Sequence, residues 1–256
     1  NPFQDFWCRE ADTPEMDYAN ARTLMLSLLI GGITIVNGIS ASMGMLSMMS
    51  WDEESGKFAG FFVAPISRFV LVTGYVISAI CLSVIFSLFT AAVSELILLI
   101  TGGTVLTVEQ MLKVLGLILL NAFSTTSFLF FITGFAKTRS AFNGISNFVY
   151  VLSGFVTGMY IPVGYMPGIV KKVLVFVPMT QGSAWIRKVF TDEVLNKTFA
   201  GLPKEVVTEY GEISGITMKL GDKVITSWMQ FALMFGSGIL FLVLSSIRMR
   251  KKNVRQ

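Results

Sequence analysis

The sequence predicts an all-α membrane protein, a polytopic helical bundle, and two observations lead to this fold class. Hydrophobic residues make up 53% of the 256 residues and charged residues only 14%, against about 25% in a typical soluble domain. Five apolar runs are long enough to cross a bilayer core as helices, which takes about 20 residues each. Histidine is absent, which excludes imidazole acid–base catalysis and His-ligated metal sites.

The five apolar runs are the expected spans of a single transmembrane domain that covers residues 1–256. An acidic segment, 1–22, precedes the first span. The predicted spans are 23–49, 69–100, 111–136, 142–161 and 226–247. Each contains few charged residues, as expected for helices that satisfy their backbone groups internally in lipid.

A short amphipathic helix over 52–64 is predicted between the first two spans. Asp52, Glu53 and Glu54 form its first turn and suit the positive end of a helix dipole. Pro65 ends it. The residues between them that carry the pattern are Gly56, Phe58, Phe61 and Phe62. The phenylalanines fall at helical spacing, so one face of this helix is aromatic.

The region 162–225 is predicted to be re-entrant and external. Pro162, Pro167, Gly168 and Pro178 interrupt a continuous helix there. The apolar stretch from Val173 to Val177 is much too short to cross a bilayer. We therefore expect the chain to dip into the outer face of the membrane and return, and then to form a small external excursion.

The tail 248–256 carries the densest cluster of Lys and Arg, which predicts a cytoplasmic C-terminus. Counting back over five spans places residues 1–22 outside. Residue 1 is Asn rather than Met, so we expect the first of six helices to be missing. The expected location is the plasma membrane of a bacterium, with the chain crossing it several times.

The order and spacing of these features resemble the permease subunits of type-2 ABC exporters. One set of matching residues is similar to the family's coupling region, and the other to its re-entrant signature before the last helix. The first set is Glu53, Glu54, Gly56, Pro65, Ile66 and Ser67, and the second is Leu152 to Gly154, Pro162, Pro167, Gly168, Pro178 and Arg187. The resemblance runs from about Leu24 to the C-terminus.

The resemblance implies a transport subunit that is not itself an enzyme, with ATP and Mg²⁺ bound by a separate ABC ATPase present in two copies. The phosphate-binding motif G-x-x-x-x-G-K-[ST] is indeed absent from the sequence. The other implied partners are a second permease, identical or closely related, and membrane lipids. No nucleic acid and no metal are expected. The implied coupling residues are Asp52, Glu53, Glu54, Gly56, Phe58, Phe61, Phe62 and Pro65.

The implied function is ATP-driven export of amphipathic, drug-like or lipid-like cargo from the cytoplasm or the inner leaflet, with polysaccharide as the alternative cargo. The sequence keeps two rivals in view. An ATP-independent channel or secondary transporter would usually carry several charges within its spans, and only Glu95 and Lys113 are candidates. A lipid-handling enzyme would need a His, a carboxylate pair or a G-x-S-x-G motif, and the spans contain none of these.

A polar and small face on the fourth span is the expected substrate path or dimer interface. Its residues are Asn143, Asn147, Tyr150, Gly154 and Gly158, which are spaced to share one side of a helix. Asn37 and Ser40 begin a comparable stripe in the first span. Gly154 and Gly158 form a GxxxG pair, for which close helix packing is favoured. For the two asparagines, path lining and interhelical hydrogen bonding both stay open.

Overall fold

A computed structural model describes residues 14–58, 68–103, 105–136, 138–199, 204–220 and 223–253. Within these ranges the chain is a helical bundle with one small antiparallel hairpin, in which Lys219 pairs with Val224. The elements are α2 (Pro14–Glu54), α4 (Arg68–Ile100), α5 (Val108–Thr133), α6 (Arg139–Val156), η1 (Val163–Tyr165), α7 (Gly168–Leu174), α8 (Pro178–Thr198), α9 (Lys204–Ile213), β1 (Lys219–Leu220), β2 (Lys223–Val224) and α10 (Ser227–Asn253).

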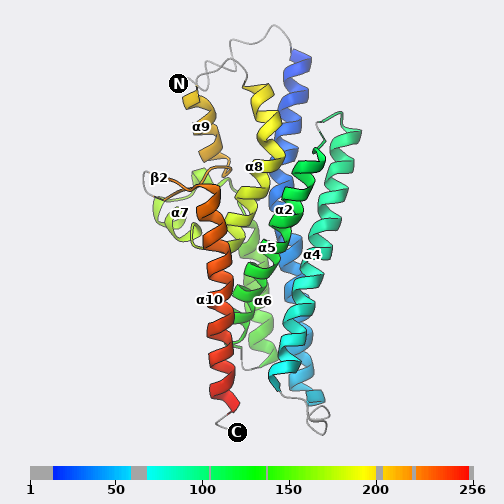
Figure 1. Ribbon diagram of the computed structural model, residues 1–256, viewed down its shortest axis with the longest axis vertical. Coiled ribbons are helices and arrows are strands. Elements are labelled where there is room, and N and C mark those ends of the chain that lie inside the picture. The colour runs from blue at the N-terminus through cyan, green and yellow to red at the C-terminus, as the bar shows by residue number, and fades with distance from the viewer. Residues whose placement is uncertain are drawn as a thin grey trace.

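The long helices run along the long axis of the molecule (Figure 1). α2, α5 and α10 finish at the lower end of the bundle, and α4 and α6 begin there. α6 rises only to mid-height, and after the short α7 the chain continues through α8 to the opposite end. The lower end is therefore where the ends of five helices meet.

The all-α membrane fold class is confirmed. Among the residues that the structure describes, four helical segments are long and apolar enough to cross a membrane: Ala21–Glu54, Arg68–Ile100, Val108–Thr133 and Ser227–Arg248. They correspond to four of the five predicted spans. The fifth is α6, whose 18 residues measure about 27 Å.

Small polar side chains join the central helices. Between α2 and α5, the hydroxyls of Ser42 and Thr126 lie 2.8 Å apart. Between α5 and α10, Ser124 Oγ donates to the Met234 carbonyl oxygen at 2.7 Å. Such residues let helices approach closely and satisfy one another where lipid supplies no hydrogen-bond partner.

Three predicted helix boundaries are wrong. The short helix predicted from residue 52 does not start there, because α2 continues to Glu54 and Asp52 lies in its last turn. The fourth span ends at Val156 rather than 161, since Gly158 has a positive φ of 68° that breaks the helix. The third predicted span begins at Val108 rather than 111, because Thr107 and Gln110 form a capping box there.

The region 162–225 contains more helix than the sequence predicts. The 21 residues of α8 pack along α2 and α5, instead of forming only a short dip and a loop. α9 and the hairpin follow. Phe199, at the end of α8, packs against Tyr210 of α9 with ring centroids 5.1 Å apart. The mean hydropathy of α8 is low because the helix carries Arg187, Lys188, Asp192, Glu193 and Lys197, and its buried side also contains Thr180, Ser183 and Thr191.

Candidate functional site

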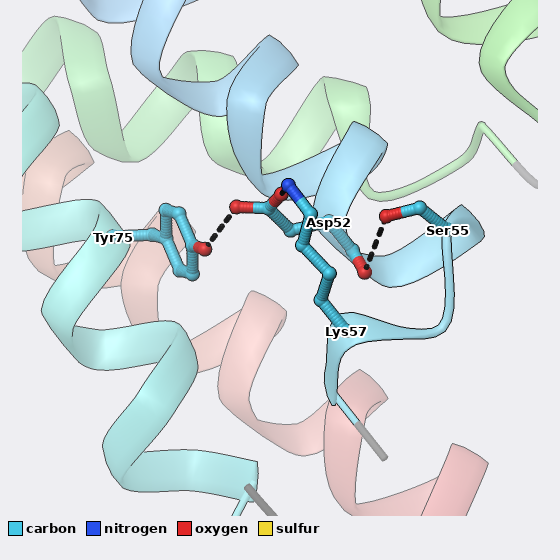
Figure 2. A network of polar contacts seen from close by, with 4 residues as sticks. All are labelled: Asp52, Ser55, Lys57 and Tyr75. Carbon is cyan, nitrogen blue, oxygen red and sulfur yellow. Dashed lines mark hydrogen bonds and ion pairs between the residues drawn. The ribbon is translucent and has the colours of Figure 1, made fainter. Parts of the chain in front are cut away.

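A polar clamp joins the end of α2 to the start of α4 at the lower end of the bundle (Figure 2). Asp52 is its centre: one carboxylate oxygen accepts from Lys57 Nζ at 2.8 Å, and the other accepts from Tyr75 Oη at 2.6 Å. Glu53 forms an ion pair with Arg68, the first residue of α4. We use "polar clamp" for Asp52, Glu53, Lys57, Arg68 and Tyr75.

The clamp closes over a tight turn. Ser55 Oγ donates to the Asp52 carbonyl oxygen at 3.4 Å, and Gly56 follows with a φ of +74°. A Cβ at Gly56 would meet nothing within 4 Å. The glycine is thus needed there for its backbone conformation, which other L-residues rarely adopt.

Phe58 anchors the far side of this turn. Its side chain is only 4% exposed, and its ring centroid lies 6.0 Å from that of Tyr75. It therefore packs within the chain and holds the turn against α4. Of the other predicted coupling residues, Glu54 is exposed at the end of α2, and Phe61, Phe62 and Pro65 lie outside the described residues.

Two cation–π contacts extend the clamp to the other helices of the lower end. The Arg139 guanidinium lies 3.5 Å from the centre of the Trp51 ring and so links α6 to α2. The Arg248 guanidinium lies 3.7 Å from the centre of the Phe135 ring and links α10 to the segment after α5. Each contact is favourable because an aromatic face attracts a cation. All five helices that meet at this end are thereby tied to a neighbour.

The predicted polar face of α6 is divided in the structure. Asn143, Asn147 and Tyr150 are exposed on the helix surface. Gly154 and Gly158 are buried, and Gly158 lies beyond the helix, so the five residues do not share one helical face. The ring of Tyr160 of the same chain covers Gly154, which therefore does not present a free surface to another helix.

The stripe predicted on α2 is also divided. Asn37 Nδ2 donates to Thr90 Oγ1 at 2.8 Å and ties α2 to α4. Ser40 is exposed, and its hydroxyl donates to the Val36 carbonyl oxygen of its own helix at 3.0 Å. The members of the predicted path that stay accessible are thus Ser40 on α2 and Asn143, Asn147 and Tyr150 on α6.

The residues of the predicted re-entrant turn start short helices. Pro162 directly precedes η1, and Pro167 and Gly168 lie at the start of α7. Pro178 is the first residue of α8, a position where a missing N–H costs nothing. The prolines therefore set where each helix begins after the preceding one has ended.

A buried arginine on α8 is a feature that sequence reasoning did not single out beyond its place in a motif. Arg187 is 1% exposed, and its Nε donates to the Leu28 carbonyl oxygen of α2 at 2.9 Å. Its Nη1 has no hydrogen-bond partner among the described residues. The only signal of this in the sequence is indirect. No Asp or Glu that could pair with Arg187 occurs between Glu109 and Asp192.

Four glycines make room for Arg187. A Cβ at Gly31 would lie 2.5 Å from Arg187 Cγ, and one at Gly32 would lie 3.1 Å from Nη2. Cβ atoms at Gly158 and Gly215 would lie 2.9 Å and 3.3 Å from Nη1. Helix α2 and two distant turns therefore enclose one cation, and any side chain at these positions would compete with it for space.

Comparison with protein families adds the identity of the fold. The model that describes the ABC-2 type transporter matches residues 10–191 of this chain. The chain belongs to the ABC-2 type transporter family. The match runs from the segment before α2 to the middle of α8, so it includes the polar clamp, α6 and Arg187. This permease is therefore a transmembrane subunit of an ABC transporter, a family whose members work with an ABC ATPase.

No curated protein and no solved structure matches the permease in the two other comparisons. Its helices α9 and α10 and the hairpin lie beyond the matched residues.

Proposed function

We propose that this permease exports amphipathic, drug-like or lipid-like cargo by alternating access, driven by ATP hydrolysis in a separate ATPase. ATP and Mg²⁺ are bound by that ATPase, two copies of which dock on a dimer of the permease or on a pair with a closely related one. Membership in the ABC-2 type transporter family supports the ATPase partner. The polar clamp is the main observation that supports coupling between the ATPase and transport.

The polar clamp supports coupling because it holds both ends of the segment that would meet the ATPase. Asp52 and Glu53 fix the end of α2, and Lys57 and Arg68 flank residues 59–67. A push on that segment is then transmitted to α2 and α4 together. α2 packs against α4, α5, α6 and α8, so its displacement reaches most of the bundle. A nucleotide state shifts the transport equilibrium when it favours one of the two arrangements.

The exposed polar residues of α2 and α6 support the proposed path. Ser40, Asn143 and Asn147 offer hydrogen-bonding groups on surfaces that this chain leaves open. Polar groups exposed to lipid are costly. A second permease facing them, with cargo passing between the two, removes that cost.

The charge distribution supports a cytoplasmic lower end. Lys57, Arg68, Arg139 and Arg248 all lie there, and positive residues are retained on the cytoplasmic side. Single cysteines, introduced into a variant that lacks Cys8 and Cys81, test this orientation. Thr138→Cys should stay unlabelled by an impermeant thiol reagent in intact cells, and Glu205→Cys should react. Labelling of Thr138→Cys from outside would reverse the orientation.

ATPase docking is tested with Phe61→Ala, Phe62→Ala in the affinity-tagged full-length permease. If these aromatic residues anchor the ATPase, the double variant should weaken the complex by about 2 kcal/mol or more. Phe69→Ala is the matched control, since Phe69 is exposed at the start of α4. Retention of the ATPase and cargo-stimulated ATP turnover are measured in detergent. Unchanged values for the double variant would favour an ATP-independent channel or a different docking surface.

A further inference from the structure

Two helices end against the same buried arginine. The last turns of α6 and α9 each close with a glycine of positive φ, Gly158 at 68° and Gly215 at 71°. In each case the next residue donates its N–H to the carbonyl oxygen five positions back, at 2.9 Å, as in the Schellman motif of a helix C-terminus. Both glycines lie beside Arg187 Nη1. Because a helix C-terminus carries partial negative charge, two negative ends lie next to one cation.

These helix ends take the place of a carboxylate partner for Arg187. Among the described residues its Nη1 has no hydrogen-bond partner, and the side chain is too deeply buried to be solvated. Glu212, the acidic residue nearest to Gly215 in the sequence, is paired with Lys219. Each C-terminus contributes about half a unit of negative charge, so the two together offset the charge of the guanidinium.

Helices α2 and α8 meet the end of α6 at the same place. The hydroxyl of Ser183, one turn before Arg187 on α8, donates to the carbonyl oxygen of Thr157, the residue that follows α6, at 3.0 Å. A Cβ at Gly32 of α2 would lie 3.2 Å from Met159 Cβ. Arg187 also bonds to α2. The upper end of α6 (Figure 1) is therefore fixed to three helices around one side chain.

The rest of α6 has room to move. An apolar groove of about 330 Å³ lies between α6, α5 and the start of α8. Its lining on α6 extends from Gly144 to Val156, about 18 Å along the helix. Asn143 and Asn147 lie on the opposite side of α6, as helical spacing requires. A movement of α6 into the groove therefore carries these path residues away from whatever faces them.

The lower end of α6 is tied to α2 by a weaker polar contact. Arg139 is exposed, and so is the Trp51 ring on which its guanidinium lies. A cation–π contact that is open to solvent contributes little, whereas the Arg187 site is buried and closely packed. The two ends of α6 thus differ in how firmly they are held, and the looser end lies beside the polar clamp.

We propose that α6 pivots about Arg187 during transport. Its upper end stays fixed while its lower end swings into the groove and opens the path beside Asn143 and Asn147. This inference rests on the proposed function, because it describes how the path opens. The 18 residues of α6 measure about 27 Å, so a rotation of about 10° moves the lower end by about 5 Å. Arg187 is then a positioning residue that acts through α6 and does not touch cargo.

Spin labels on α2 and α6 test the pivot in a cysteine-free, full-length permease bound to its ATPase in lipid nanodiscs. A pair at Met48 and Ser140 reports on the lower ends, and a pair at Met25 and Ile161 on the upper ends; all four residues are exposed. Nucleotide binding should change the lower distance by about 5 Å and leave the upper distance unchanged. Equal changes in both distances would show that α6 moves as a whole, and would overturn the pivot.

Closure of the groove is tested with Gly144→Phe. A Cβ at Gly144 meets nothing within 4 Å, so the ring can occupy the groove that this residue lines. Cargo-stimulated ATP turnover should fall to the unstimulated rate, and the lower distance should stop responding to nucleotide. Gly116→Phe is the matched control, also a helical glycine with open space, and should match the wild type. A wild-type distance change in Gly144→Phe would show that the groove does not close.

The charge of Arg187 is tested without the ATPase. Arg187→Met fills the space but no longer attracts the two helix ends, so the upper distance distribution should broaden. Arg187→Lys should restore the narrow distribution, and Lys188→Met, which removes the neighbouring exposed cation, should leave it unchanged. An unchanged distribution in Arg187→Met would overturn the role of Arg187 alone. If neither distance of the wild type responded to nucleotide with the ATPase bound, alternating access itself would be contradicted, and the pivot with it.

Discussion

The polar clamp and the Arg187 site both tie α2 to a neighbouring helix, but they do so by opposite means. The clamp uses charged and hydroxyl groups at a partly exposed helix end, where Lys57 pairs with Asp52. The Arg187 site uses a fully buried cation, one carbonyl oxygen and the space that four glycines leave. Exposed ion pairs contribute little to stability, whereas close packing in a core contributes much.

This difference assigns the two sites different tasks. Substitutions around Arg187 should change whether the bundle holds together. Substitutions in the clamp should change whether the bundle responds to its ATPase.

Gly31→Leu should be the most damaging. Its Cβ would lie 2.5 Å from Arg187 Cγ and 3.0 Å from the Arg187 backbone nitrogen, so α2 and α8 must separate to admit the side chain. Overpacking of this kind costs about 3 kcal/mol. Thermal unfolding of the purified permease in detergent measures the loss. Gly44→Leu is the matched control on the same helix, where a Cβ meets nothing within 4 Å. Equal stability of the two variants would show that α2 and α8 are not closely packed there.

Arg187 itself should tolerate replacement according to volume rather than charge. Arg187→Ala leaves a cavity and should lose about 2 kcal/mol of unfolding free energy. Arg187→Met fills most of the space and removes a buried charge with an unpaired N–H, so its stability should lie within about 1 kcal/mol of the wild type.

Thermal unfolding of both Arg187 variants separates packing from electrostatics. A large loss in Arg187→Met together with recovery in Arg187→Lys would show that the positive charge is needed. In that case Arg187 would pair with an anionic group that is not near it in this arrangement of the helices.

How much of this could be predicted from the sequence depends on what buries each helix. Helices α2, α4, α5 and α10 are apolar over long stretches, so hydropathy finds them. Helix α8 is not found by hydropathy because polar residues such as Thr180, Ser183 and Arg187 face the interior of the bundle, and the burial of Arg187 depends on glycines that are distant in the sequence. Spacing placed Gly158 on the α6 face, but it cannot reveal that the helix ends at Val156.

The lower end shows the same limit in another form. The sequence predicts a coupling region that starts with three acidic residues. Only the placement of these acidic residues was wrong, because Asp52 lies in the last turn of α2 rather than at the start of a new helix. The capping box at Thr107 and Gln110 was readable as T-x-x-Q. The hydrogen bond from Tyr75 to Asp52 could not be predicted, since it joins residues 23 positions apart.

The hydrogen bond between Ser42 and Thr126 should have a smaller effect than Arg187→Ala. The two hydroxyls lie 2.8 Å apart and are fully buried between α2 and α5. A double-mutant cycle with Ser42→Ala and Thr126→Val should give a coupling energy of about 0.6 kcal/mol, typical of such bonds in membrane bundles. Unfolding of the four proteins in detergent provides the cycle. A coupling energy several times larger would place the main stability of α2 in its polar contacts rather than in its packing on α8.

The smallest effect on stability, combined with a clear effect on function, is expected for Asp52→Asn. Asparagine keeps an acceptor for the Tyr75 hydroxyl and loses the ion pair to Lys57. Because Lys57 is exposed and Asp52 is partly exposed, the pair contributes little to stability, and the unfolding temperature should stay close to the wild-type value. Cargo-stimulated ATP turnover of the permease with its ATPase should fall, since the turn between α2 and α4 is held less firmly. Lys113→Gln, which breaks the exposed pair with Glu109 at the start of α5, is the control and should change neither quantity. If Asp52→Asn instead unfolded as readily as Gly31→Leu, the clamp would be part of the structural core, and the division between a site for stability and a site for coupling would fail.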